Sequence, residues 1–383
     1  MKKILMIPGP IEYEDDVLNK MSLPTISHTS REFISAFRDS LNDVSTIFGA
    51  SGNSVPFIIS GSGTLAMEAS TVNFITRDSR VLVVSTGYFG DRFANLLSRF
   101  TKNVEIMKQP LGTAVDSNEL LERALKNSYD VITITHVDTS TGVKNDIKEI
   151  AEKLKGTDSL LIVDAVCSAG AEPLNMDWGI DVAFSASQKA LGAPPGLAVG
   201  VVGERALQRM GNREPLTYYS DLRNWLPVFR TTLEGRPSYF ATPNVNLTMA
   251  LAVSLKSILK EGLEKRIRRH EVIGEAFRKA LMEMGLELIA KTSFANTVSA
   301  VFLPSNVELT KFLSSAEERG VVFAGGLIDK ISTRYFRIGH MGSIGPTEIL
   351  AAIGAVEYGL NKNGVDIKNG AGLSAAQEIL YKL

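Results

Sequence analysis

The stretch that decides the fold is residues 160–203, LLIVDAVCSAGAEPLNMDWGIDVAFSASQKALGAPPGLAVGVVG. Three short apolar runs lie in it, at 160–163, 182–185 and 197–202. Continuous apolar runs of this length are typical of strands covered on both faces. Asp164 ends the first run, and Lys189 lies in the loop after the second. Because α/β sheets bind ligands beyond the carboxyl ends of their strands, we expect Asp164 and Lys189 to mark a site.

The same pattern extends back along the chain. Further apolar runs lie at 55–60, 81–85, 104–107 and 131–135, and helical patterns lie at 65–75, 91–100, 118–127 and 148–154. Strand and helix therefore alternate, which predicts a mostly parallel sheet covered by helices.

The pattern changes after Pro243. Leucines recur at helical spacing over 247–263, and apolar residues continue to Leu281, which predicts one long or broken helix. A smaller α+β region should follow, with strands at 297–303, 321–324 and 335–338 and helices at 309–319 and 346–360. We expect an α/β fold in three parts: an N-terminal segment, 1–20, that lines the site, a large domain, 21–250, and a connecting helix with a small C-terminal domain, 251–383.

Composition narrows the classes of function. The 383 residues suit two fused domains, and 41 basic against 42 acidic residues give no broad positive field for nucleic acid or membrane. The basic stretch 265–270 lies in a helical pattern, where we expect a solvated face. Cys167 is the only cysteine, so no internal disulfide can form, and the four histidines are too scattered for a metal site. The chain shows neither a secretory signal nor an apolar run long enough to span a membrane, so we expect a cytoplasmic protein.

Four features could carry chemistry, and each also has a structural interpretation. Residues 60–64, SGSGT, could bind a phosphate at the start of a helix or simply turn the chain. Asp164 could face a ligand or cap a helix. Lys189 could be solvated, but its small and apolar neighbours would lower the amine's pKa and make it nucleophilic. Arg337, in an apolar strand pattern, could clamp a carboxylate or form a structural ion pair.

In this order the four features resemble the class V pyridoxal-phosphate aminotransferases, most of all the alanine–glyoxylate, serine–pyruvate and serine–glyoxylate enzymes. The matching motifs are PGP at 8–10, GYFG at 87–90, HVDTSTG at 136–142, VDAV at 163–166, SQKA at 187–190, PPG at 194–196, YFATP at 239–243 and RIG at 337–339. The resemblance runs to about residue 342. It implies the type I fold of pyridoxal-phosphate enzymes, with a large sheet domain and a small C-terminal domain.

The resemblance also implies a role for each matched residue. Lys189 would form the aldimine with pyridoxal phosphate, and Asp164 would pair with the ring nitrogen. Phe89 would stack on the ring, which Ser140 and Val166 would flank. The phosphate would be held by Ser62, Gly63, Thr64 and Gln188, with Tyr239 and Thr242 reaching the site of the partner subunit in a homodimer. Arg337 would bind the substrate carboxylate, and Gly9, with Ser140, would line the substrate pocket.

Three matched positions depart from parts of the family. Thr64 stands where some members have His, Phe89 where some have Trp, and Asp138 where Glu is usual, which leaves the partner of Asp138 open. His136 lies in a matched motif and His28 near the expected entrance, and an ordinary hydrogen-bonded role is open for both.

The implied reaction is a ping-pong transfer of an amino group from serine or alanine to glyoxylate or pyruvate, with Lys189 moving the proton. Three alternatives stay open. A cysteine desulfurase-like lyase would need a loop cysteine, whereas Cys167 fits a buried structural thiol. A phosphoserine aminotransferase would need a further basic pair that the sequence does not reveal. A non-catalytic binding protein of this fold would not need Lys189, Asp164 and Arg337 together.

Overall fold

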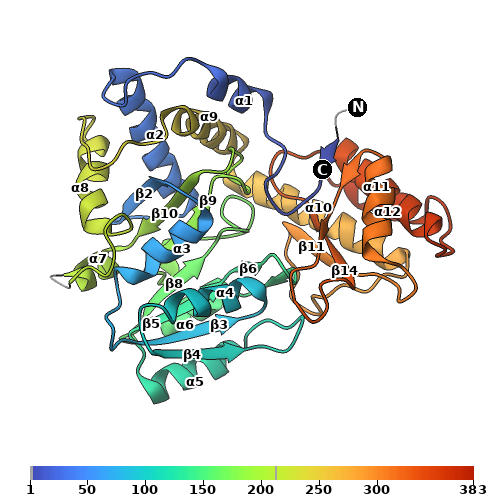
Figure 1. Ribbon diagram of the computed structural model, residues 1–383, viewed down its shortest axis with the longest axis horizontal. Coiled ribbons are helices and arrows are strands. Elements are labelled where there is room, and N and C mark those ends of the chain that lie inside the picture. The colour runs from blue at the N-terminus through green and yellow to red at the C-terminus, as the bar shows by residue number, and fades with distance from the viewer. Residues whose placement is uncertain (1–2, 212–213) are drawn as a thin grey trace.

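A seven-stranded sheet forms the centre of the larger part of the molecule (Figure 1). The computed structural model describes residues 3–211 and 214–383. The strands, in the spatial order β2-β10-β9-β8-β5-β3-β4, are β2 Val55–Ser60, β10 Leu197–Val202, β9 Val182–Ala186, β8 Leu160–Asp164, β5 Val131–Thr135, β3 Arg80–Ser85 and β4 Asn103–Lys108. All residues of β5, β8, β9 and β10 are buried, which explains their uninterrupted apolar runs.

The sheet is mostly parallel, as predicted, with one exception. β10 runs antiparallel to both of its neighbours, β9 and β2. The connection from β9 to β10, residues 187–196, is too short for the crossover that a parallel pair requires, about a dozen residues or more. The chain therefore turns directly back, and Lys189 lies in this turn.

Helices cover the sheet and connect its strands (Figure 1). They are α1 Asp15–Ser22, α2 Arg31–Ile47, α3 Gly63–Val72, α4 Tyr88–Leu97, α5 Ser117–Asn127, α6 Ile147–Leu154, α7 Glu204–Met210 and α8 Leu222–Leu233, with a 3-10 turn at Met176–Trp178. A small hairpin, β6 Val137–Asp138 and β7 Val143–Lys144, follows β5. The helices between strands lie where the sequence predicted them, with ends shifted by a few residues.

Two helices lead from the sheet to the C-terminal part. α9 Val245–Glu261 and α10 Leu263–Glu283 meet at Gly262, so the predicted helix is broken rather than continuous. The C-terminal part has a sheet of order β11-β14-β13 and its own hydrophobic core. Its elements are β11 Val298–Phe302, α11 Leu309–Glu318, β12 Val321–Val322, β13 Ala324–Gly325, β14 Tyr335–Gly339, α12 Pro346–Lys362 and α13 Ala371–Leu380.

The N-terminal segment joins this C-terminal part. β1, Ile4–Leu5, pairs in parallel with β12, and the backbone amide of Gly339 donates to Met6 O at 2.7 Å. Figure 1 shows the blue N-terminal strand beside the red and orange helices. Residues 6–14 therefore pass between the two parts of the molecule before α1 begins.

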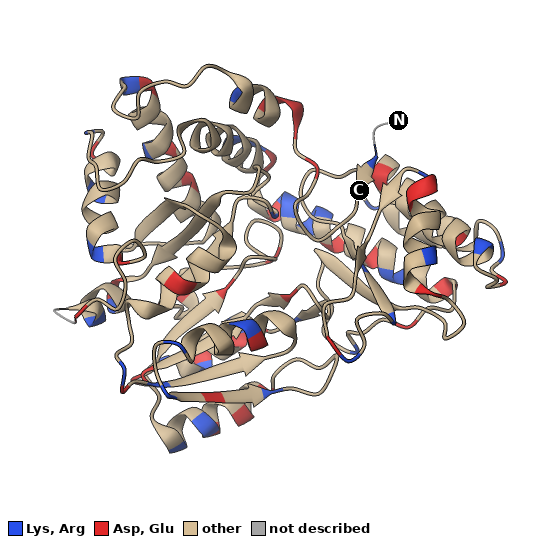
Figure 2. Cartoon of the chain, in the orientation of Figure 1, with Lys and Arg blue, Asp and Glu red and all other residues tan. Residues whose placement is uncertain are grey.

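The charged residues are spread over the outer helices with both signs mixed (Figure 2). The expectation of a solvated face at 265–270 is wrong at two positions. Arg266 is 2% exposed and His270 is fully buried, because both bind backbone groups of other segments. Among residues 3–211 and 214–383, no helix is both long and apolar enough to cross a bilayer.

Candidate active site

A cavity of about 180 Å³ lies at the carboxyl ends of the central strands. Eight of the residues singled out in the sequence line it: Ser62, Gly63, Thr64, Phe89, Asp164, Val166, Gln188 and Lys189. Six more residues line the cavity and were not assigned to a site from sequence: Met67, Arg92, Thr135, Val137, Thr139 and Cys167. Segments far apart in the chain thus meet at one point of the sheet edge, as expected for a parallel α/β sheet.

Lys189 is buried in the turn between β9 and β10. Its Nζ donates a hydrogen bond to the carbonyl oxygen of Pro8. Burial lowers the pKa of the Lys189 amine from its usual value. Gly9 packs directly on this side chain, since a Cβ added to Gly9 would lie 2.7 Å from Lys189 Nζ. Residue 9 therefore has to lack a Cβ atom for the Lys189 amine to lie where it does.

Asp164 ends β8, next to the strand that leads to Lys189. β8 and β9 pair in parallel, with Asp164 opposite Phe184. The Asp164 carboxylate accepts a hydrogen bond from the amide of Val166 at 3.0 Å. Burial raises its pKa to about 7, although this hydrogen bond acts in the opposite direction. The two buried groups of opposite type thus come from neighbouring strand ends, as the sequence predicted.

The start of α3 forms a third wall of the cavity. Ser62 is the residue before the helix and Gly63 its first residue, and the first amides of a helix have no partner within it. Within the described chain, the Ser62 hydroxyl does not cap the helix. A Cβ on Gly63 would lie 3.3 Å from the Ala186 side chain, so glycine allows close packing at this point. The wall therefore presents amide and hydroxyl donors at a positive helix end, which suits an anion.

Two buried oxygens of the cavity residues point to a polar ligand. Gln188 Oε1 and Thr135 Oγ1 have no hydrogen-bond partner among the residues that the structure describes. Unpaired buried polar atoms are uncommon in folded proteins because each costs free energy. A ligand with polar groups at these points would satisfy them.

Asp138, whose partner the sequence left open, fixes the wall that carries Phe89. One carboxylate oxygen accepts from the amides of Phe89 and Gly90 at 3.0 and 3.3 Å. The other accepts from the amide and the hydroxyl of Ser140 at 2.9 and 2.6 Å. The Ser140 hydroxyl in turn accepts from the amide of Tyr88 at 2.9 Å. Asp138 therefore caps α4 and holds Phe89 and Ser140 in one buried arrangement.

Arg337 lies in β14, beside the cavity but not among its lining residues. It is 9% exposed, and its Nε donates to Gly325 O at 2.8 Å. One terminal nitrogen lies 3.4 Å from the carbonyl oxygen of Thr139, which does line the cavity. Burial lowers the pKa of its guanidinium group, and that group is held by carbonyl oxygens rather than by a carboxylate.

Tyr239 and Thr242 lie outside the cavity. Their hydroxyl groups are 3.2 Å apart, and Tyr239 is 61% exposed. The His28 ring lies 5.5 Å from the Tyr239 ring, whereas His136 is buried with a pKa lowered to about 3 by burial. The structure thus separates Tyr239, Thr242 and His28 from the group around Lys189, whereas His136 lies between the lining residues Thr135 and Val137 and its amide donates to Asp164 O at 2.9 Å.

Two lining residues could have been found from the sequence. Thr135 is the last residue of β5, a predicted strand next to β8, and strand ends were the criterion that selected Asp164. Arg92 lies three residues after Phe89 on α4, with its guanidinium 5.2 Å from the Phe89 ring centroid. Helical spacing places both on one face. Asp138 gave no such signal, because its role depends on amides of a distant helix.

Comparisons with known proteins agree with this geometry. The family model described as aminotransferase class-V matches residues 12–328. Alanine–glyoxylate aminotransferase 1 of Saccharomyces cerevisiae is 40% identical over 356 residues, which cover 88% of this chain and 91% of the yeast protein. Serine–glyoxylate aminotransferase of Methylorubrum extorquens is 31% identical over 98% of this chain and 95% of its own length. The structure of pyridoxamine–pyruvate aminotransferase from Mesorhizobium loti superimposes with a TM-score of 0.93 at 26% identity, covering 100% of this chain and 98% of that one.

Proposed function

The chain belongs to the class-V aminotransferases, and we propose that it moves an amino group from serine or alanine to glyoxylate or pyruvate, using pyridoxal phosphate attached to Lys189. Its fold is the type I fold of this enzyme class, and it is a transaminase. One observation supports the proposed site most. A buried amine with a lowered pKa and a buried carboxyl with a raised pKa share a single cavity, at adjacent strand ends.

The residues of the cavity fit pyridoxal phosphate. The start of α3, with Ser62, Gly63 and Thr64, offers donors to a phosphate, and Gln188, whose side-chain NH2 group can also donate, lies in the same cavity. Phe89 offers an aromatic face to a ring, and Asp164 offers a carboxylate to a ring nitrogen. Val166 and Ser140 would flank the ring, the latter from its place beside Phe89. When bound, the cofactor supplies an electron-accepting ring that stabilises negative charge at the substrate's α carbon.

Lys189 would carry the protons of the reaction. Its burial favours the neutral amine, which can attack a carbonyl group and can take a proton from a carbon atom. Pro8 O holds Nζ in the structure, and Gly9 restricts the space in which the amine moves. When it is not bonded to the cofactor, the Lys189 amine would take a proton from the substrate's α carbon as a base. It would then donate that proton to the cofactor. The exchange would be ping-pong, with the donor product leaving before the acceptor binds.

Arg337 would bind the substrate carboxylate. Its guanidinium is buried and bound only to neutral carbonyl oxygens among the described residues, so its positive charge is available to an anion. The choice of serine or alanine as donor, and of glyoxylate or pyruvate as acceptor, follows the names of the relatives.

A homodimer would complete the site. Tyr239 and Thr242 are exposed, outside the cavity of their own subunit, and would reach the phosphate in the partner's site. The single cysteine, buried and free, fits a reducing compartment such as the cytoplasm.

The proposal is tested by absorption spectra of the purified protein with pyridoxal phosphate. We expect a visible band that disappears when L-serine or L-alanine is added and returns with glyoxylate or pyruvate. Lys189→Ala should lose the band and the turnover while keeping the fold, and Lys148→Ala, an exposed lysine of α6, should keep both. A wild-type protein without the band, or a Lys189→Ala variant with near-normal turnover, would overturn the proposal. A visible band that does not change when either amino acid is added would indicate that the amino donor is another compound.

A further inference from the structure

The joint between α9 and α10 lies against the turn that carries Lys189. Gly262 makes the break, with a φ of +88° that other residues rarely adopt. Arg266 follows in the first turn of α10 and is almost completely buried. A buried arginine is costly unless its donors are used, so its partners show what it does.

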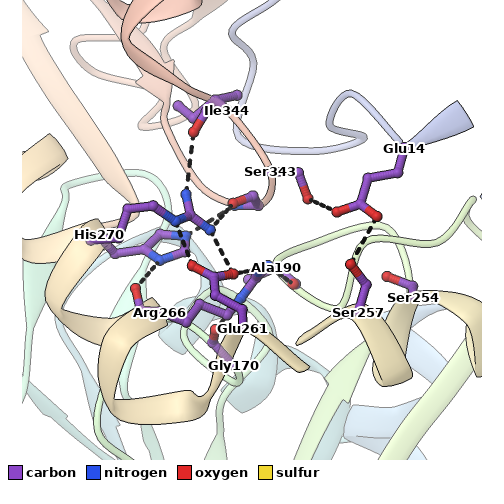
Figure 3. Close-up of polar contacts among 12 residues, drawn as sticks. Glu14, Gly170, Ala190, Ser254, Ser257, Glu261, Arg266, His270, Ser343 and Ile344 are labelled. Carbon is purple, nitrogen blue, oxygen red and sulfur yellow. Dashed lines mark hydrogen bonds and ion pairs between the residues drawn. The ribbon is translucent and has the colours of Figure 1, made fainter. Parts of the chain in front are cut away.

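Arg266 binds three separate segments (Figure 3). Its Nε donates to the carbonyl of Gly170 at 2.9 Å, in the loop that follows Asp164. One terminal nitrogen donates to the carbonyl of Ala190, the residue after Lys189, at 3.0 Å. The other donates to the Glu261 carboxylate at 2.8 Å. One guanidinium thus connects the turn that carries Lys189 with the loop that follows Asp164.

Side chains of these two helices bind the backbone of the Lys189 turn. The Ala190 carbonyl accepts from Arg266 of α10, and the Leu191 carbonyl accepts from the Ser254 hydroxyl of α9 at 2.8 Å. Within the turn, the amide of Gly192 donates to Lys189 O at 2.8 Å. The backbone on the C-terminal side of Lys189 therefore depends on side chains that never reach the cavity.

The same cluster extends to the C-terminal part. Glu261 accepts from Arg266 and also from Arg269, at 2.6 and 3.1 Å. Arg269 further donates to the carbonyls of Gly342 and Ile344 at 3.0 and 3.2 Å. Burial alone would raise the pKa of Glu261, but the hydrogen bonds from the two arginines outweigh it and lower that pKa. Glu261 is therefore an ionised bridge between the Lys189 turn and the loop 342–344.

The N-terminal segment links the same joint to the side chain of Lys189. Glu14 accepts hydrogen bonds from Ser343 at 2.7 Å and from Ser257 at 2.9 Å (Figure 3). The segment before Glu14 includes Pro8, whose carbonyl binds Lys189 Nζ. The amine and the backbone of Lys189 are thus both tied to segments that meet at this joint.

We propose that Arg266 is a positioning residue for Lys189, and that the Glu261–Arg269 bridge makes the position of the Lys189 turn depend on the loop 342–344. The inference rests on the proposed role of Lys189. Without Arg266, the carbonyls of Ala190 and Gly170 lose their donor, and the turn relaxes. A displacement of a reacting group by about 1 Å can cost about 100-fold in rate, which makes a remote arginine matter for the reaction.

Hydrogen exchange of the protein without cofactor tests the structural step directly. In Arg266→Met we expect the peptide 186–196 to exchange at least about tenfold faster, because the amides of Gly192 and Ala193 are bonded within the turn. The matched control is Arg268→Met, an exposed arginine of the same helix, which should exchange as the wild type does. If Arg266→Met does not fold, the same measurement is made on Arg266→Lys. The peptide 186–196 should again exchange faster than in the wild type, since one ammonium group cannot replace three directed donors.

Two further measurements separate positioning from stability alone. With pyridoxal phosphate added, the pH at which the visible band titrates should shift in the Arg266 variants, and kcat should fall about 10- to 100-fold with KM within about threefold. Ser254→Ala removes the bond to the Leu191 carbonyl. It should shift the titration pH and lower kcat in the same direction as the Arg266 variants do, but by a smaller amount.

Wild-type exchange of the turn together with an unchanged titration would overturn the inference, even if the variant melted at a lower temperature. A wild-type protein without any band would instead refute the role of Lys189. In that case faster exchange of the turn in Arg266→Met would still show that Arg266 holds it.

Discussion

Asp138→Asn is the substitution that should disturb the cavity wall most without touching the cavity. Asp138 accepts four hydrogen bonds, two on each oxygen, and is fully buried. All four partners donate, which stabilises the ionised carboxylate, whereas burial acts in the opposite direction and raises the pKa of the Asp138 carboxyl. Asn keeps the shape but offers one oxygen and one donor group. Two hydrogen bonds to a charged acceptor are then lost, each worth roughly 1.5–3 kcal/mol, so we expect the free energy of unfolding to fall by roughly 3–6 kcal/mol.

The assay is urea denaturation of the protein without cofactor, followed by titration with pyridoxal phosphate. Because Phe89 loses its fixed backbone, the dissociation constant of the cofactor should rise by up to about tenfold, the worth of an aromatic stack of roughly 0.5–1.5 kcal/mol. The matched control is Asp116→Asn. Asp116 also accepts two amides at a helix start, but it is exposed, and Asn caps helices equally well. The control should therefore leave the urea midpoint and the cofactor affinity nearly unchanged.

The role of Asp138 as a buried cap is refuted if Asp138→Asn unfolds at the same urea concentration as the wild type. It is also refuted if the buried and the exposed cap respond equally, since burial is the cause that separates them. A loss of stability with unchanged cofactor affinity would keep the role of Asp138 as a cap and reject its link to Phe89.

Two further predictions concern Gly9 and Asp164. Gly9→Ala should slow the appearance of the visible band with pyridoxal phosphate at least about tenfold, because the new methyl group would lie 2.7–2.9 Å from three Lys189 atoms. The control is Gly52→Ala. Gly52 also has a positive φ but has open space around it, so this variant should show the wild-type rate. Asp164, with its pKa raised to about 7 from 3.8 by burial, favours the folded state in its neutral form, so this contribution to stability is present below about pH 4 and is lost as the pH rises towards 7. Asp164→Asn should therefore gain stability over the wild type without cofactor between pH 4 and 8, by at most about 4 kcal/mol, and equal pH profiles in urea denaturation would contradict it.

The sequence predicted the sheet well because its strands are buried on both faces. Runs such as 160–163 and 197–202 have no polar face, and this pattern depends on the strand alone. The direction of β10 was not predictable from its composition, because a buried antiparallel strand reads the same as a parallel one. The length of the connection 187–196 held that information.

The candidate site was predictable where a residue's place follows from a strand end. Asp164 and Lys189 met this condition, and so did Thr135, although it lay outside the predicted site. Arg266 did not meet it. A charged residue in a helical pattern predicts solvent exposure, and its burial is decided by the carbonyls of Gly170 and Ala190, which arrive from distant parts of the chain.

The charges around Lys189 explain why such remote support is needed. Burial shifts Lys189 and Asp164 in opposite directions, and both shifts favour the neutral forms. Because burial disfavours the charged form of each group, the attraction between their charges is weakened and the pair does not hold the turn in place by itself. The carbonyl of Pro8 on one side and the donors of Ser254 and Arg266 on the other do so with directed hydrogen bonds. The amine can then stay reactive, because its position does not rely on a salt bridge that would keep it protonated.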